Sequence, residues 1–600
     1  MMYYIFAEDG GQWYDSHHIC SALLLNTKSA TMLHMPANDK NKELRNYLRD
    51  YWEHRLRHNP TFATYIGDHR YDDALEDLSE ESLASHVDYY KSLLGKIEGI
   101  DGSLLTAENR LDRKLIKTTL DNHIRMYGYK THYVPLDQLG GPHIDFPQLI
   151  EFHPFDTHRD LANYISRLNA FPRQIDQVIE NLQKGTAHKI TGFKKNMETA
   201  AGQVEAFTKF SPEDHPMFSP VIKLKENFSE QDKNEFGNSV REAISLHVTP
   251  AYLKLFNYLS GEYVKHCREK EGIWALPGGI EMYRFFVEYH TTTDLSPEDI
   301  HETGRREVER ISIGIKKLMQ KIGFSRGIRE FADHVKEKKD LHFKSRDEIL
   351  NSYREILSQM DKRLPGYFGR LPRARYDIKE IEKYREQSAP AAYYYPPPRD
   401  FSRPGYFYAN TYNPEQRPGF ITEALSYHEA VPGHHLQIAL MQEQEDLPDF
   451  RKYEGSTAFI EGWALYAEKL AKEMGCYQDD FSEYGRLNFE IWRAVRLVVD
   501  TGIHFFKWGR DEAIRYCMEN SGEDEHEIEV EVDRYIAMPG QALAYKIGEL
   551  KILELREKAR KALGPKFDIR AFHDRLLENG APPLYSLEHI MNKLAGYVTG

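Results

Sequence analysis

Apolar residues recur at helical spacing along almost the whole chain, from about residue 42 onward. In segment 296–323, Ser296 can cap a helix, Pro297 suits its first turn and Gly323 can end it. Segment 372–416 differs, because it combines alternating β-forming residues with proline and so predicts short strands. We therefore predict a mainly α fold, a large multi-helix bilobal body with a small β-sheet placed just before the segment that contains His428.

A chain of 600 residues is too long to pack around one small hydrophobic core, but large helical enzymes often form one continuous body. Neither a repeat nor a flexible linker divides the sequence. We predict one helical domain over 41–600, with lobes of about 41–370 and 371–600. Residues 1–40 show no helical period, and we expect a poorly ordered extension there.

The formal net charge of -14 argues against nucleic acid or an anionic membrane as the main partner. No apolar run reaches the roughly 18 residues that span a bilayer, and the N-terminus lacks the basic start of a signal peptide. The four cysteines are scattered, without a C-x-x-C pair, as in proteins of a reducing compartment. We therefore expect a cytoplasmic protein and leave its oligomeric state open.

The stretch "SYHEAVPGHHLQ" begins like the H-E-x-x-H helix of zinc peptidases, but Pro432 stands where the second histidine belongs. On a straight helix, His434 would be rotated by about 240° from His428, and His435 would lie about 10 Å along the axis. Pro432 removes one helical hydrogen bond, and Gly433 tolerates unusual backbone angles. A bulge here can return His434 to His428. The alternative is that these histidines are structural or exposed.

A third metal ligand is expected from a carboxylate on the following helix. Glu461 lies in an apolar setting, where an unpaired charge is costly and a zinc ion would offset it. Glu468 is the alternative, seven residues on and on the same face, but it stands nearer to lysines and is expected to pair at the surface. Glu429 follows the first ligand directly and is predicted to act as the general base on a metal-activated water.

Four blocks of sequence carry a resemblance to a known family: "SYHEAVPGHHLQ", "EGWALYAEKL", "VVDTGIHFFKWGRDEAIRY" and "RYIAMPGQALAYKIGELKI". They resemble the DUF885 family, whose large helical proteins are similar to zinc metallopeptidases of the thimet oligopeptidase, angiotensin-converting enzyme and carboxypeptidase Taq kind. The resemblance spans about 45–597. It implies a helical shell with a deep active-site cleft that admits short peptides.

The resemblance also implies site residues. Its His-Glu-x-x-Pro-Gly-His block supports His434 over His435 as the second ligand, and its Glu-Gly-Trp block supports Glu461 as the third. Its other two blocks fall on Asp500 to His504 and on Pro539 to Tyr545. The predicted site therefore consists of the ligands His428, His434 and Glu461 with the catalytic residues Glu429, His504 and Tyr545.

His504 and Tyr545 are chosen because peptide hydrolysis passes through an oxyanion that needs fixed donors. Tyr535 is a further candidate and is assigned to substrate binding. The alternative for each is an ordinary core position. Arg493 and Arg496 share a helix with His504, and either could bind a substrate carboxylate or form a surface ion pair; Arg496 is the one assigned to substrate.

The strand-like segment 407–411 precedes the predicted zinc helix. In related peptidases an edge strand at this place binds the substrate backbone by strand addition, so Phe407 and Asn410 are assigned to substrate binding. The tyrosines of this segment line the cleft or simply pack.

The predicted function is a zinc-dependent metallopeptidase that hydrolyses short peptides with one Zn²⁺ per chain. Cobalt or manganese could occupy the same ligands. Two alternatives remain: a zinc hydrolase of another amide or ester, and an inactive peptide-binding protein on the same fold. The sequence contains neither a G-x-S-x-G elbow nor a P-loop, which disfavours a serine hydrolase and a nucleotide enzyme.

Overall fold

A computed structural model describes residues 39–592 except 382, 384–385, 387–389 and 402. Of the predicted extension over 1–40, only the last two residues are described, and they begin the first helix. The described chain is mainly helical with one small sheet, which confirms the predicted fold class. Within this part of the chain no helix is both long enough and apolar enough to cross a bilayer.

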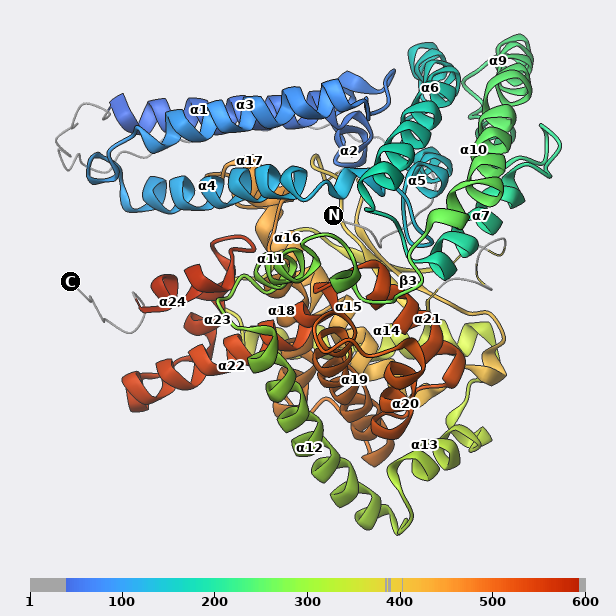
Figure 1. The fold of residues 1–600 in the computed structure, drawn as a ribbon. Helices are drawn as coiled ribbons and strands as arrows, with labels where there is room; N and C mark the ends of the chain where they lie inside the picture. Colours follow the sequence, from blue (N-terminus) through green and yellow to red (C-terminus); the bar gives the residue numbers. More distant parts are fainter. Residues whose placement is uncertain (1–38, 382, 384–385, 387–389, 402, 593–600) are drawn as a thin grey trace, which may run out of the picture.

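Residues 39–261 form the upper part of the molecule in Figure 1. Two buried clusters hold it together, one that joins the first four helices to Phe450 and Tyr453 from later in the chain, and one that ends at Cys267. The helices are α1 (Asp39–His58), α2 (Pro60–Tyr65), α3 (Glu80–Glu98), α4 (Ala107–Gly128), α5 (Pro142–Gln148), α6 (His158–His188), α7 (Lys194–Phe207), α8 (Ser219–Ile222), α9 (Glu230–Ala243) and α10 (Thr249–Gly261).

The rest of the chain packs around two large clusters, one that runs from Ile273 to Met591 and one that runs from Phe193 to Ala542. Contacts cross residue 370, because α12 packs on α19 and α14 packs on α15. The predicted lobes of about 41–370 and 371–600 stay a prediction. The helices are α11 (Gly279–Thr291), α12 (Pro297–Ile322), α13 (Ile328–Lys336), α14 (Arg346–Arg363), α15 (Thr422–Glu429), α16 (His434–Gln442), α17 (Asp449–Tyr453), α18 (Thr457–Glu473), α19 (Asp480–His504), α20 (Arg510–Asn520), α21 (Glu525–Ala537), α22 (Ala544–Leu563), α23 (Ile569–Leu577) and α24 (Leu584–Asn592).

The start and stop signals of α12 act as predicted. The Ser296 side chain accepts from the Asp299 N–H, and the Asp299 carboxylate accepts from Ser296, which completes a capping box. Gly323 follows the last turn with a φ of 84°, a conformation that costs glycine little.

The small sheet contains β1 (Tyr376–Glu380), β2 (Ala392–Tyr395) and β3 (Gly405–Ala409) in the order β1-β3-β2. Strand β3 is central: it pairs with β1 in parallel and with β2 in antiparallel orientation. The prediction that segment 407–411 is an edge strand for substrate is therefore wrong for β3, because both of its edges are already paired over Tyr406–Ala409. Among the described strands, β2 has an edge without a strand partner, and this edge faces the predicted zinc helix.

Two glycines let α18 and α22 cross at close range. A Cβ on Gly548 would lie 1.8 Å from the Ala458 carbonyl oxygen, and a Cβ on Gly462 would lie 2.4 Å from the Gly548 Cα. No side chain fits between the two backbones, so the crossing depends on glycine at both positions.

We expect Gly548→Ala to destabilise the protein by about 3 kcal/mol or more, because the added methyl group overlaps fixed backbone. Gly202→Ala is the matched control: Gly202 is an exposed residue of α7 with open space around its Cα, and alanine there should change stability by no more than about 1 kcal/mol. Denaturant unfolding of the two variants measures the difference, and equal effects would contradict the close crossing.

Candidate metal centre

The predicted zinc helix is interrupted where the sequence places Pro432 and Gly433. Helix α15 ends at Glu429, and α16 begins at His434. The chain folds back so tightly that a Cβ on Gly433 would lie 1.9 Å from the His428 carbonyl oxygen. The break thus brings the start of α16 against the end of α15, as the predicted bulge requires.

This fold-back brings His428, His434 and Glu461 together, with one potential ligand atom from each within 4.8 Å of the others. The Nε2 atoms of both histidines lie 3.7 Å from the same oxygen, Oε2 of Glu461. The His428 and His434 rings stand nearly perpendicular, with centroids 4.8 Å apart. Two imidazoles and one carboxylate are a common zinc ligand set that leaves a position open for substrate or water.

Glu468 orients one of these rings. Its Oε1 lies 2.7 Å from His428 Nδ1, which directs Nε2 toward Glu461. Carboxylates in this role are typical of metal-binding histidines. The prediction that Glu468 pairs at the surface is wrong, because the residue is only 1% exposed. Its position seven residues after Glu461, on the same helix face, was the signal in the sequence.

The second histidine has an unsatisfied atom. His434 Nδ1 is buried and has no hydrogen-bond partner among the described residues. Burial lowers the pKa of His434 to about 4, so its imidazole is neutral at pH 7 and able to bind a metal.

His428 and Glu461 form the charged part of the cluster. Burial alone would lower the pKa of His428, but its interactions with Glu461 and Glu468 raise it to about 9. Burial alone would raise the pKa of Glu461, but His428 and His434 hold it at about 2. The carboxylates therefore favour positive charge at this point, whether a proton or a metal ion supplies it.

His435 is not part of the cluster. Its Nδ1 lies 2.8 Å from the Tyr394 hydroxyl, and its ring packs on Tyr376 with centroids 4.8 Å apart. The structure therefore separates the two histidines: His434 faces Glu461, and His435 faces the sheet.

Glu429 faces the free edge of the sheet. The Tyr394 N–H of β2 donates to Glu429 Oε2 at 3.0 Å. Burial raises the pKa of Glu429 to about 7; the charge of Glu461 adds to this, and the charges of His428 and Arg493 oppose it. Glu429 thus lies beside the candidate metal ligands as a carboxyl group that can gain or lose a proton near neutrality.

The predicted substrate residues of β3 are built into the fold. Phe407 is fully buried and packs against Tyr353. The Asn410 side chain donates to the carbonyls of Glu386 and Pro390 and accepts from the Tyr412 N–H. Both side chains are engaged within the protein, which corrects their assignment to substrate.

His504 is also engaged. Its Nδ1 accepts from the Ile273 N–H at 3.1 Å, and its Nε2 lies 2.9 Å from the Tyr535 carbonyl oxygen. With both ring nitrogens bonded to the backbone, no proton is left for a reacting oxygen. The neighbouring Asp500 accepts from the Tyr283 hydroxyl and the Gly540 N–H. These residues join helices, and we correct the catalytic assignment of His504 to a structural one.

Arg496 and Tyr535 form a pair of their own. Arg496 binds Glu531 at 3.0 Å, and the Tyr535 hydroxyl donates to the same carboxylate at 2.9 Å. Their assignment to substrate is therefore not supported by their contacts. Tyr545 differs: burial and then the charge of Glu461 raise its pKa, which places its hydroxyl in the field of the metal ligand.

Arg493 is the cation beside the cluster. Its charge acts on Glu429, His434 and Glu461. Across the described residues no carboxylate forms an ion pair with its guanidinium, and its buried Nε has no partner. From the sequence, Arg493 and Arg496 are both candidates, and Arg496 is the one assigned to substrate binding. Helix spacing alone does not show which of the two arginines forms an ion pair with a carboxylate.

Comparison of the chain with known proteins shows the family to which it belongs. No functionally curated protein matches the chain. A candidate lipoprotein from Colwellia psychrerythraea has a crystal structure that matches with a TM-score of 0.89 and 30% identity, over 93% of this chain and 99% of that one. A candidate lipoprotein of unknown function from Shewanella oneidensis matches with a TM-score of 0.72 at 18% identity, over 92% of this chain and 99% of that one, and shows the fold alone.

Neither description mentions a peptidase, so that part of the predicted resemblance stays a prediction. The family described as "Bacterial protein of unknown function (DUF885)" matches residues 60–591. That match covers nearly the whole chain, and the chain therefore belongs to the DUF885 family.

Proposed function

We propose that the protein is a zinc-dependent metallopeptidase that hydrolyses short peptides. The observation that carries this proposal is the convergence of His428, His434 and Glu461 beside a second carboxyl group, that of Glu429, which is not one of the three candidate ligands. A purely structural ion pair does not need this additional carboxyl group at its side.

The residues present fit zinc. Two imidazoles and one carboxylate satisfy its preference for nitrogen and oxygen ligands, and a metal ion bound to His428 would replace the proton that the neighbouring carboxylates favour there. Small shifts of the three side chains would bring the ligand atoms to the separations that Zn–N distances of about 2.0–2.1 Å require. When bound there, zinc would activate a water molecule and polarise the substrate carbonyl.

Glu429 is the proposed proton carrier. The Tyr394 N–H holds it at Oε2, which fixes the direction of the carboxylate. Its role is to accept a proton from the attacking water and to deliver that proton to the departing amine. Tyr545 is the proposed donor to the oxyanion, a role that the sequence analysis assigned to it together with His504.

The free edge of β2 is the proposed support for the substrate backbone. Because outward-pointing backbone groups alternate along a strand, Ala392 and Tyr394 share one edge of β2. An extended peptide added to this edge would run past Glu429. This moves the predicted strand addition from β3 to β2.

Arg493 is the proposed receptor for a substrate carboxylate. A buried guanidinium without an ion-pair partner favours an anion, and a peptide carries one at its C-terminus. This supports cleavage near the carboxyl end of short peptides. Two alternatives remain: hydrolysis of another amide or ester, and inactive peptide binding. The experiments below distinguish both from the proposed peptidase.

The site of action stays a prediction. The sequence led us to expect a cytoplasmic protein with neither nucleic-acid nor membrane partners, whereas two structural relatives are described as candidate lipoproteins. Fractionation of cells that express the full-length gene distinguishes the two locations.

We expect His434→Ala to contain one zinc fewer per chain than the wild type, because it removes a ligand. His435→Ala is the matched control and should keep the wild-type content, because His435 binds Tyr394. Elemental analysis of dialysed protein gives both values. A loss of zinc in His435→Ala and not in His434→Ala would contradict the assigned ligand set.

Glu429→Gln should keep the zinc of the wild type and lose about 10²–10⁴-fold in kcat on short peptides, because glutamine cannot accept the proton. A panel of peptides, other amides and esters measures this loss. If the wild type cleaves only esters, the result would favour the alternative of a zinc hydrolase that acts on another amide or ester. Zinc binding without any turnover in the wild type would favour the binding protein.

Arg493→Gln should raise KM about 10–100-fold for a peptide with a free C-terminal carboxylate, the loss of one charge-assisted contact. The same peptide with an amidated C-terminus is the control and should be cleaved equally by both proteins. Arg493→Lys should recover part of the affinity. Equal losses on the acid and the amide would show that Arg493 does not bind the carboxylate.

A further inference from the structure

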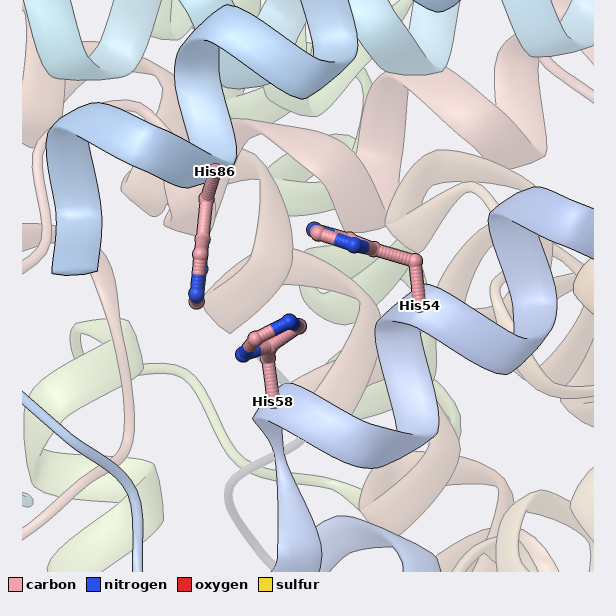
Figure 2. A group of neighbouring side chains, drawn as sticks. All are labelled: His54, His58 and His86. Carbon is pink, nitrogen blue, oxygen red and sulfur yellow. The ribbon is translucent and has the colours of Figure 1, made fainter.

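A second group of histidines lies in the N-terminal helices. His54 and His58 stand one turn apart near the end of α1, and His86 faces them from α3 (Figure 2). None of the elements that form the candidate metal centre contributes to this group. Figure 2 shows the three rings directed into one space between the two helices.

The geometry of the group is that of a ligand set. One nitrogen from each histidine lies within 4.8 Å of the others, the same limit that the first cluster meets. The ring centroids are 4.3 Å apart for His54 and His58, and 4.1 Å apart for His58 and His86. Residues at i and i+4 share a helix face, so α1 supplies two donors and α3 the third.

One of the donors has no other function. Among the residues that the structure describes, none forms a hydrogen bond with the buried His54 Nε2. Its ring is held by stacking on Tyr89, with centroids 3.8 Å apart. On His86, Nε2 lies 3.3 Å from the Ser82 hydroxyl, which is a long contact. Buried polar atoms are normally satisfied, so an atom left like this in a fixed ring points to an additional partner.

The protonation state suits a metal. Burial, and after it the repulsion from the neighbouring histidines, lowers the pKa of His54 to about 3 and that of His86 to about 4. Burial likewise lowers the pKa of His58, and the charge of Arg57 adds to this. All three rings are neutral at pH 7, the form that binds a metal. The charge of the adjacent Arg55 is balanced by Glu454 at 2.8 Å.

We propose that His54, His58 and His86 form a second metal site, for a divalent transition-metal ion that prefers imidazole. Zn²⁺ is the ion on which the proposal is tested. The three side chains are partly exposed, so a water molecule can supply the fourth ligand. The ion links α1 to α3 and so stabilises the first helices of the chain. The proposal is independent of the proposed peptidase.

The test uses the full-length His434→Ala protein, in which the first centre lacks a ligand. The protein is stripped with a chelator, reloaded with ZnCl₂, dialysed against zinc-free buffer and analysed for zinc. We expect one zinc per chain, lost in His434→Ala/His58→Ala. We also expect ZnCl₂ to raise the unfolding temperature of the single variant and not that of the double variant.

His158 provides the matched control, because it is an exposed histidine that pairs with Asp232 at 3.0 Å. His434→Ala/His158→Ala should keep its zinc. If the His58 variant does not fold, His86→Gln tests the same site from α3. Equal zinc in the variants with and without the three histidines would overturn the proposal, as would an absence of zinc from His434→Ala.

Discussion

The close approach of Gly433 to the carbonyl oxygen of His428 is the constraint on which the candidate centre depends. It turns the chain between α15 and α16 so that two histidines six residues apart face one carboxylate, which a straight helix cannot do. The turn is held from outside, because the Trp463 indole N–H donates to the Pro432 carbonyl at 2.9 Å. The turn between the two helices therefore rests on a backbone contact and one side-chain hydrogen bond, both independent of any bound ion.

A few residues of helix α18 supply a candidate ligand, a close helix crossing and the hydrogen bond that holds the turn. Glu461 faces the two histidines, Gly462 allows α22 to cross at backbone distance, and Trp463 holds the turn. Two turns later, Glu468 orients the His428 ring. Packing and chemistry are thus linked in one helix: a change that shifts the crossing of α18 and α22 also shifts a ligand and the residue that supports another.

Much of this could be predicted from the sequence because it depends on local rules. Helical spacing and capping residues located the helices, and the Pro-Gly pair indicated the turn that returns His434 to His428. The rest depends on contacts between distant segments. Strand order placed β3 in the centre, and Asn410 turned inward to backbone carbonyls. Only the packed structure shows that both ring nitrogens of His504 form hydrogen bonds with the backbone. It also shows that, among the described residues, Arg496 and not Arg493 forms an ion pair with a carboxylate.

Among the described residues Arg493 forms no ion pair, whereas a buried charged network lies close to it on the same helix. Three residues earlier on α19, Glu490 binds Lys546 of α22 at 3.0 Å, and Lys546 also binds Glu549 at 2.6 Å. Removing one partner from such a buried network costs about 3–5 kcal/mol, so α19 and α22 are firmly joined at this point. That junction fixes the helix positions of Arg493 and Tyr545. A rigid frame of this kind allows a buried guanidinium to stay without a carboxylate partner, as the proposed binding of a substrate carboxylate requires.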